Sequence, residues 1–207
     1  IIPDLIVNKR SNQWDIIVND NWIPSLQISK IYHKMIDDPD PQTTKTKKFL
    51  KHNYSSAKWF LQAIEQRRDT LVNVMNEIIN HQSEFFKGNI EELQPMKLQD
   101  IAESIDMDIS TISRATRGKY VETPYGIYEL KHYFTDSITL NDGKEISTYR
   151  VKLALRQLIK DEDKHNPFSD EELKDKLIKR GYPVARRTVA KYREQLKLPV
   201  ARLRKEL

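Results

Sequence analysis

The residues best suited to chemistry in this chain are basic side chains gathered at its C-terminal end. Residues 185–207 hold eight Lys and Arg against two acidic residues, a net charge of +6, whereas the whole chain carries +5. The rest of the chain therefore sums to −1. A cationic block on a near-neutral body is typical of a surface that docks on a polyanion. A solvated charged tail would have the same composition, and charge alone leaves both interpretations open.

Within this block, residues 185 to about 196 predict an amphipathic helix. The stripe expected to pack inward consists of Ala185, Val189, Tyr192 and Leu196. The other faces carry the charge and suit a DNA groove, where Arg matches guanine and either Lys or Arg can grip phosphate. Pro199 is expected to stop the helix, and the basic tail at 202–205 to contact the DNA backbone or be disordered. The candidate DNA-binding residues of this helix are Ala185, Arg186, Arg187, Thr188, Ala190, Lys191 and Arg193.

A second candidate surface lies in residues 97–117, whose pattern predicts a helix-turn-helix. The turn is expected at 105–107, and Asp108 is placed to cap the second helix. The positions expected to face inward are Leu98, Ile101, Ala102, Ile112 and Ala115. Hydroxyls and Arg on the exposed side of the second helix suit a major groove, although many helical hairpins share the pattern. The candidate DNA-binding residues here are Ser110, Thr111, Ser113, Arg114, Arg117 and Lys119.

Catalytic and metal chemistry find little support in the sequence. The absence of cysteine excludes disulfides, thiolate zinc sites and cysteine nucleophiles. The five glycines form no phosphate-cradling loop, and the five histidines show no paired ligand spacing. A recombinase or nuclease would need a nucleophile or carboxylate cluster, and none can be assigned. We therefore expect no catalytic residue, no metal and no cofactor.

The elements that must position the two basic helices are expected to be mainly α-helical. Between Pro41 and Gly88 the sequence has no Gly or Pro, and apolar residues recur every three or four positions from Ser55 onward. This pattern predicts one helix over about 56–87, capped by Ser55-Ser56, stopped by Gly88 and roughly 48 Å long. Such a rod would bridge modules or lie against a partner. Two helices with a kink near Arg67-Arg68-Asp69 are the alternative.

Shorter elements are expected on both sides of this rod. In chain order, the sequence predicts β structure over 5–28 with a turn at 8–12, a Ser29-capped helix over 29–36 with Ile31, Tyr32, Met35 and Ile36 on one side, a loop over 37–41, an aromatic-rich core flap over 118–134, a turn and linker over 135–146, and helices over 147–161 and 169–180. The last of these opens with a capping box at Ser169–Glu172 and is stopped by Gly181.

The C-terminal basic helix carries a motif that resembles a known family. The run ARRTVAKYRE at 185–194 matches, without a mismatch, the ten-residue RpoN box of the sigma-54 family of bacterial transcription factors. Runs resembling the same family follow in order, namely IP-L-I (23–28), AKW (57–59), QR-DTL (66–71), FF (85–86), STISR (110–114), KY (119–120), TP-G-YELK (123–131) and YF (133–134). The sequence departs from the family at Ile109, where an acidic residue is usual, and it lacks the Gln- and Leu-rich segment with which the family begins.

The resemblance implies a sigma subunit that binds core RNA polymerase and recognises two promoter elements, with initiation dependent on an ATP-driven enhancer-binding activator. It implies a mainly α, multi-module fold with a long connecting helix, two helix-turn-helix modules and a small β element near the N-terminus. The implied parts are 1–54, the C-terminal part of the polymerase-binding domain; 55–88, the connecting helix; 89–134, a helix-turn-helix domain for the downstream GC (−12) element; 135–146, a linker; and 147–207, the RpoN-box domain for the upstream GG (−24) element.

The sequence also carries expectations about setting and assembly. It has no apolar run of about 18 residues and no signal peptide, so we expect no membrane contact. The resemblance implies a cytoplasmic, nucleoid-associated bacterial protein. Its lack of an initiator Met and of the activator-contacting segment predicts the C-terminal portion of a longer chain. Two unlike basic helices favour a monomer on an asymmetric site. The alternatives are an ordinary helix-turn-helix regulator, which would bind a palindrome as a dimer, and a pure polymerase-binding protein.

Overall fold

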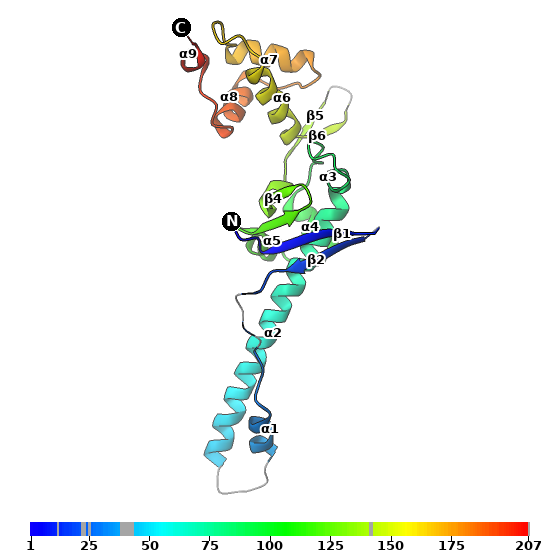
Figure 1. The fold of residues 1–207 in the computed structure, drawn as a ribbon, viewed down its shortest axis with the longest axis vertical. Helices are drawn as coiled ribbons and strands as arrows, with labels where there is room; N and C mark the ends of the chain where they lie inside the picture. The colour runs from blue at the N-terminus through cyan, green and yellow to red at the C-terminus, as the bar shows by residue number, and fades with distance from the viewer. Residues whose placement is uncertain (12, 22–23, 25, 38–43, 141–142, 207) are drawn as a thin grey trace.

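A long helix dominates the computed structural model, with helix α1 beside one end and two compact modules stacked toward the other (Figure 1). The structure describes residues 1–11, 13–21, 24, 26–37, 44–140 and 143–206. The elements in chain order are β1 (Leu5–Arg10), β2 (Gln13–Val18), α1 (Lys30–Asp37), α2 (Thr44–His81), α3 (Ser83–Phe86), α4 (Leu98–Ser104), α5 (Ile109–Thr116), β3 (Tyr120–Thr123), β4 (Gly126–Glu129), the 3-10 turn η2 (Leu130–Tyr133), β5 (Ser137–Thr139), β6 (Glu145–Ser147), α6 (Thr148–Lys160), α7 (Asp170–Lys179), α8 (Arg186–Gln195) and α9 (Ala201–Arg204). The described chain is thus mainly α-helical with a small N-terminal sheet, as expected.

Helix α2 is one continuous element of 38 residues, about 57 Å long at about 1.5 Å per residue. It runs unbroken through Arg67-Arg68-Asp69, so the kinked alternative is wrong. The expected start at Ser55-Ser56 is also wrong, because both residues lie inside the helix. The expected end at Gly88 is wrong as well: the helix breaks at Gln82, and α3 carries the chain on to Gly88, whose φ is 113°. The side chain of Gln82 is buried there, donating to the carbonyls of Gln94 and Tyr133.

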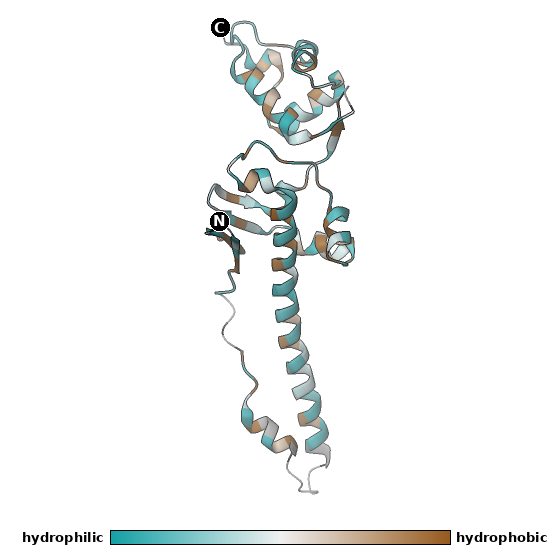
Figure 2. Ribbon diagram, turned by 90° about the vertical axis from the view of Figure 1, so that its right-hand side faces the viewer, coloured by the Kyte–Doolittle hydropathy of each residue, from teal (hydrophilic) through white to brown (hydrophobic). Residues whose placement is uncertain are grey.

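The N-terminal half of α2 has few neighbours in the described chain. Figure 2 shows α1 beside this half, while the sheet and the other helices gather at its opposite end. The expected cap of α1 is confirmed, because Ser29 Oγ accepts a hydrogen bond from the Ile31 amide at 3.3 Å. The large apolar side chains exposed along this part of the molecule are Ile31, Met35, Phe49, Trp59 and Phe60. The part of the expected 37–41 loop beyond residue 37 lies outside the described residues, as do Ile23 of the 23–28 run and Asn141-Asp142 of the expected linker.

The N-terminal strands belong to a sheet whose other half comes from residues 120–129. Strand β1 pairs antiparallel with β2 and parallel with β3, giving the order β2-β1-β3-β4. The turn between β1 and β2 is shorter than expected, since the strands continue to Arg10 and from Gln13. The aromatic-rich flap forms β3, β4 and η2, and it contributes to the core as expected, with Tyr133 fully buried.

Two separate hydrophobic cores organise the chain. The first draws on β1, α2, α3, α4, α5, β3 and η2, and its fully buried members include Leu5, Met75, Ile78, Phe85, Ile101, Ile112, Val121 and Tyr133. Residues of the expected 1–54, 55–88 and 89–134 ranges therefore share one core. The second draws on α6, α7 and α8 and includes Val151, Leu155, Leu173, Leu177, Val189 and Tyr192.

The range expected to be a turn and linker, 135–146, lies between the two cores and contains strand β5 and the start of strand β6. Strands β5 and β6 pair antiparallel with Ser137 opposite Ser147. Beyond them, the helix expected over 147–161 is confirmed as α6, and the helix over 169–180 as α7. The capping box of α7 is also confirmed, because the Glu172 carboxylate accepts from the Ser169 amide at 2.7 Å and Ser169 Oγ accepts from the Glu172 amide at 3.3 Å.

Candidate nucleic-acid interface

Helix α8 packs one stripe inward and leaves the rest of its surface open. Val189 and Tyr192 are buried in the second core and Leu196 is half-buried against it, as the spacing predicted. Ala185 is exposed, so its expected inward position is wrong. It occupies the N-cap with an extended backbone, φ −78° and ψ 154°, and therefore lies outside the helical register that the spacing assumed.

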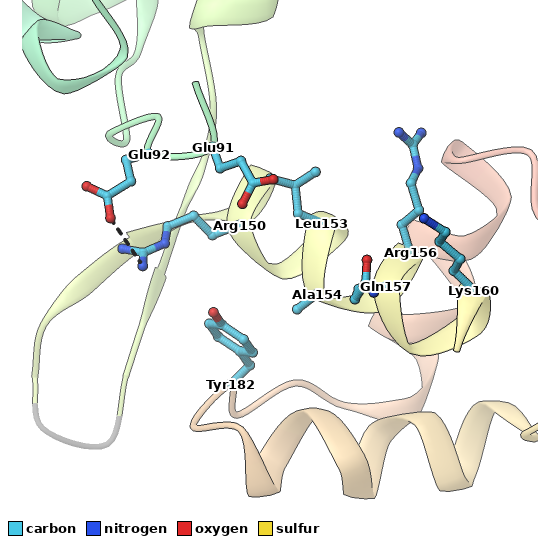
Figure 3. A pocket seen from close by; sticks show the side chains of 9 residues that line it. All are labelled: Glu91, Glu92, Arg150, Leu153, Ala154, Arg156, Gln157, Lys160 and Tyr182. Atoms are coloured by element: carbon cyan, nitrogen blue, oxygen red, sulfur yellow. Dashed lines mark ion pairs between the residues drawn. The ribbon is translucent and has the colours of Figure 1, made fainter. Parts of the chain in front are cut away.

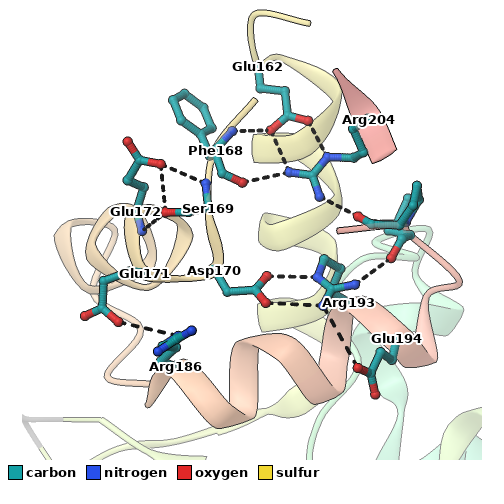
Figure 4. Close-up of polar contacts among 12 residues, drawn as sticks. Glu162, Phe168, Ser169, Asp170, Glu171, Glu172, Arg186, Arg193, Glu194 and Arg204 are labelled. Carbon is teal, nitrogen blue, oxygen red and sulfur yellow. Dashed lines mark hydrogen bonds and ion pairs between the residues drawn. The ribbon is translucent and has the colours of Figure 1, made fainter. Parts of the chain in front are cut away.

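Arg193 is buried, which corrects the expectation that it lies on the outward face. Its side chain is only 4% exposed. Its guanidinium donates to both oxygens of the Asp170 carboxylate, at 2.8 and 3.2 Å, and to the carbonyl of Leu198 at 2.9 Å (Figure 4). The hydrogen bond to Asp170 raises the pKa of Arg193 further. This arginine joins the start of α7 to the end of α8 and is not available to DNA.

The remaining basic residues of α8 face away from the second core. Arg186, Arg187 and Lys191 are exposed, while Thr188 and Ala190 are half-buried between them. Arg186 lies 3.8 Å from the Glu171 carboxylate, and its side chain is 70% exposed. An ion pair this long and this exposed to solvent contributes little and does not fix the side chain. Among the described residues, Arg187 and Lys191 have no ion-pair partner. Three cations therefore extend into solvent from α8, whose opposite side is packed against the second core.

Lys152 on α6 extends this cationic face. Its ammonium lies 5.3 Å from the centre of the Tyr192 ring. Burial lowers the pKa of Lys152, and the nearby charge of Lys191 acts in the same direction, while Asp136 opposes both. Such mutual repulsion between two cations is relieved when a polyanion binds beside them.

The basic tail after α8 forms a short helix, so the expected disorder is wrong, while its Arg202 and Lys205 are exposed. Residues 201–204 form helix α9, and the Arg204 guanidinium donates to both oxygens of Glu162, at 2.5 and 2.9 Å. It also donates to the carbonyls of Pro199 and Phe168 (Figure 4). Both charged side chains of this pair are buried. Arg204 therefore fastens the tail to the segment between α6 and α7.

Helices α4 and α5 pack against each other and against α2. Ile101, Ala102 and Ile112 are buried, and Leu98 and Ala115 are half-buried against the same core, as expected. The turn between the helices contains Asp106 at a φ of 52°. Asp108 occupies the N-cap of α5, but its side chain accepts no capping hydrogen bond, so the expected side-chain cap is wrong.

The outward side of α5 carries most of the expected polar residues. Ser110, Ser113, Arg114 and Arg117 are exposed, and Thr111 is half-buried. Thr111 and Arg114 line one side of a hollow whose other side is α2, at Ala63, Gln66, Arg67 and Thr70. Lys119 lines the same hollow, but its ammonium donates to the Asp4 carboxylate at 2.7 Å. Lys119 therefore fastens the segment before β1 to the segment before β3.

Several of the residues that hold these surfaces in place are acidic and were not singled out from the sequence. Asp170 holds Arg193, Glu162 holds Arg204, and Asp4 holds Lys119. Asp20 pairs in the same way with Arg67 and Arg68 of α2. Their partners are distant in sequence, so no local spacing could have indicated them. Among the described residues, no cluster of three or more His, Cys, Asp or Glu side chains could hold a metal ion. None of the described helices is both long and apolar enough to cross a bilayer.

Comparison with known proteins gives one consistent result. Residues 47–206 match the family described as Sigma-54, DNA binding domain. The whole chain is 39% identical, over 211 residues, to the RNA polymerase sigma-54 factors of Salmonella typhimurium and Escherichia coli, and it spans 43% of their length. The fold is similar to the crystal structure of Aquifex aeolicus sigmaN bound to promoter DNA, with a TM-score of 0.56, 28% identity, and 99% of this chain and 60% of that chain covered.

Proposed function

The chain belongs to the sigma-54 family of transcription factors, and we propose that it recognises promoter DNA at two elements as part of a transcription initiation factor bound to core RNA polymerase. The observation that carries this proposal is the outward face of α8. Arg186, Arg187 and Lys191 project from a helix whose inward face is fixed by the second core and by Arg193. A helix that is fixed on one side and exposes arginines on the other is the form in which proteins read guanine in a major groove.

In this proposal α8 reads the upstream GG (−24) element. Arg186 and Arg187 contact guanine, while Lys191 contacts phosphate. Thr188 and Ala190 give the helix a shallow surface between these cations, and Ala185 lies at the end of the helix nearest to the groove. Arg193 has no part in the contact, since Asp170 holds it inside the module.

Helix α5 is proposed to read the downstream GC (−12) element. Its exposed Ser110, Ser113, Arg114 and Arg117 support this, and Thr111 lies beside them. The pairs α4–α5 and α7–α8 are then two helix-turn-helix modules, each with its second helix toward DNA. Arg114 is proposed to contact a base. Contact with phosphate, or with a protein segment near the same element, would leave discrimination at GC intact in its Ala variant.

The N-terminal region and the first half of α2 are proposed to contact core RNA polymerase. The exposed apolar side chains Phe49, Trp59 and Phe60 support a protein-binding surface along this half. Initiation is proposed to depend on an ATP-driven activator, as the family resemblance implies. Polymerase binding would then fall mainly to residues 1–54, and the helix over 55–88 would connect this part to the DNA-binding modules. The modules at 89–134 and 147–207 would read the GC and GG elements.

A gel shift with a GG-N10-GC duplex tests the proposal directly. Replacing either element should weaken binding by about 1–3 kcal/mol for each base pair that α5 or α8 reads specifically. Replacing both should leave only salt-sensitive, sequence-independent binding. Equal affinity for the promoter duplex and for a scrambled duplex of the same length would refute the proposal.

A further inference from the structure

The two modules are joined by a side chain that crosses from one to the other. Tyr149 lies in the first turn of α6, yet it packs against the first core and not the second. Its ring lies 5.1 Å from the His132 ring at an interplanar angle of 87°. His132 in turn stacks on Tyr128, with ring centres 5.1 Å apart and planes 22° apart. The second module therefore packs, through Tyr149, against the aromatic cluster of the first.

Hydrogen bonds fix the backbone at the same place. Ser147, which caps α6, is buried, accepts from the Tyr149 amide at 3.1 Å and donates to Thr135 Oγ1 at 2.9 Å. The Thr148 amide donates to the carbonyl of Asp136 at 2.9 Å. Thr135 also exchanges two backbone hydrogen bonds with Met96, each at 3.1 Å. The start of α6 is thus tied to the strand that leaves the first module and, through it, to the segment before α4.

The outer side of this junction is open and weakly held. The Arg150 guanidinium lies 3.9 Å from the Glu92 carboxylate, and the two side chains are 42% and 45% exposed. Figure 3 shows this pair at one end of a hollow between the 91–92 segment and α6, with Tyr182 of the second module on another side. An exposed ion pair of this kind contributes at most about 1 kcal/mol. The half-buried ring contacts and the hydrogen bond of buried Ser147 therefore hold the junction more firmly than this ion pair does.

We infer that this joint, consisting of Tyr128, His132, Thr135, Ser147 and Tyr149, determines which spacing between the two promoter elements the chain accepts. The inference rests on the proposed function, because it concerns the distance between α5 and α8 on DNA. Adding one base pair moves the next element by about 3.4 Å and turns it by about one tenth of a helical turn. A flexible linker would accommodate that change. A packed joint must either lose its contacts or leave one of the two promoter elements unbound.

The test measures binding to duplexes with spacers of nine, ten and eleven base pairs, and to duplexes with the GG element alone. We expect the parent chain to prefer one spacing about tenfold or more, since the other spacings place one element out of reach of its helix. Tyr149→Ala should flatten this preference to about threefold or less and keep its affinity for the GG-only duplex. Tyr149→Phe is the matched control, since it keeps the ring and should keep the preference.

Three outcomes separate the claims. If Tyr149→Ala keeps the spacing preference of the parent while both bind the GG-only duplex, the joint does not set the spacing. If the parent binds all spacings equally but still needs both elements, the inference is again overturned and the proposed function stands. If the parent does not distinguish either element from scrambled DNA, the proposed function itself fails.

A second measurement does not depend on the variant folding or on DNA. The chain has no cysteine, so Glu103→Cys on α4 and Lys179→Cys on α7 can carry two spin labels at unique positions. The parent and Tyr149→Phe should give one narrow distribution of label distances in pulsed electron resonance. A broad distribution in the parent would overturn the inference.

Discussion

Two arginines on the same helix, Arg187 and Arg193, are placed for opposite tasks. Arg187 is exposed and has no ion-pair partner among the described residues. We expect Arg187→Ala to weaken binding to a GG-containing duplex by about 1–3 kcal/mol, because the guanidinium no longer reaches guanine, and to leave the melting temperature unchanged. Arg202→Ala is the control, since it removes an equal charge from an exposed position in the same module. Equal effects in the two variants, or an equal effect on scrambled DNA, would reduce Arg187 to a general electrostatic role.

Arg193 should behave in the reverse manner. Arg193→Ala leaves the Asp170 carboxylate and the Leu198 carbonyl without their donor, and we expect the free energy of unfolding of the second module to fall by about 3 kcal/mol. Thermal unfolding followed by circular dichroism measures this. At a temperature where the variant is still folded, its preference for GG over scrambled DNA should match that of the parent. An unchanged melting temperature together with abolished discrimination would return Arg193 to the DNA surface.

His132 predicts a dependence of stability on pH. Burial among aromatic rings lowers its pKa from the usual 6.5, and its Nε2 has no hydrogen-bond partner among the described residues. Because the unfolded chain takes up this proton more readily than the folded chain, stability should be full above about pH 6.5 and should decrease as the pH falls toward the lowered pKa. The charged neighbours Lys131, Asp136 and Lys152 line the same hollow.

The control for this prediction is His132→Phe, which keeps a ring and removes the titration. Its melting temperature should change less than that of the parent between about pH 7 and pH 5, where an unshifted histidine would titrate. Parallel curves for the two chains would assign the acid sensitivity to other groups.

Among single residues, the periodicity of the sequence predicted which apolar side chains of α8 are buried, but it did not predict which basic side chains are held by ion pairs. The inward positions of Val189 and Tyr192 followed from periodicity alone. Arg193 directly follows Tyr192, so on a helical wheel it borders the buried stripe, and only the approach of Asp170 from α7 decides that it turns inward. Lys119 is likewise paired with a distant residue, since Asp4 lies more than a hundred positions away in the sequence. Spacing describes one element, whereas these side chains are held by another.

Among the elements, α2 combines a packed half with an exposed half. Its C-terminal half supplies Leu71, Met75 and Ile78 to the first core, while Phe49 and Trp59 are 64% and 70% exposed. We expect amides in 71–79 to exchange hydrogen only through global unfolding, with an opening free energy of about 5–15 kcal/mol. Amides in 47–60 should exchange through local opening, which needs only a small fraction of that free energy. Hydrogen exchange read by mass spectrometry measures both segments in one experiment.

Core RNA polymerase provides the control for α2. If the exposed half binds polymerase, adding the enzyme should slow exchange in 47–60 and leave 71–79 unchanged. High protection of 47–60 in the free chain would contradict the expected fraying.

The elements themselves were largely predictable, and their partners were not. Capping signals at Ser29 and Ser169 and the stop at Gly181 correctly located helix ends. The start of α2 was misplaced because Ser55-Ser56 was taken as a cap, although nothing between 44 and 54 breaks a helix. The pairing of β1 with β3 had no local signal, since hydrophobic alternation indicates a strand but not its neighbour. Strands β5 and β6 were not predicted within the 135–146 range, because each has only three residues.

The whole molecule is elongated, and this shape allows a direct test of its assembly. Figure 1 shows the two modules and the α2 rod arranged along one axis. We expect light scattering to give the mass of a single chain, 24.5 kDa, while gel filtration places it at a larger apparent mass because of the extended shape. A dimeric mass at micromolar concentration would instead favour a regulator that binds a palindrome.

The parallel pairing of β1 with β3 has a consequence for how the chain is made. The amide of Tyr120 donates to Asp4 across 116 positions of sequence, so β1 is synthesised roughly 6 to 23 s before its partner. During that interval Leu5 and Val7 lie on a strand with one open edge, a template for pairing with a neighbouring nascent chain. Lys9 and Arg10 discourage such pairing only at the far end of β1. The yield of native protein should therefore depend on how fast the ribosome crosses the codons of α2, a helix that takes no part in the pairing itself.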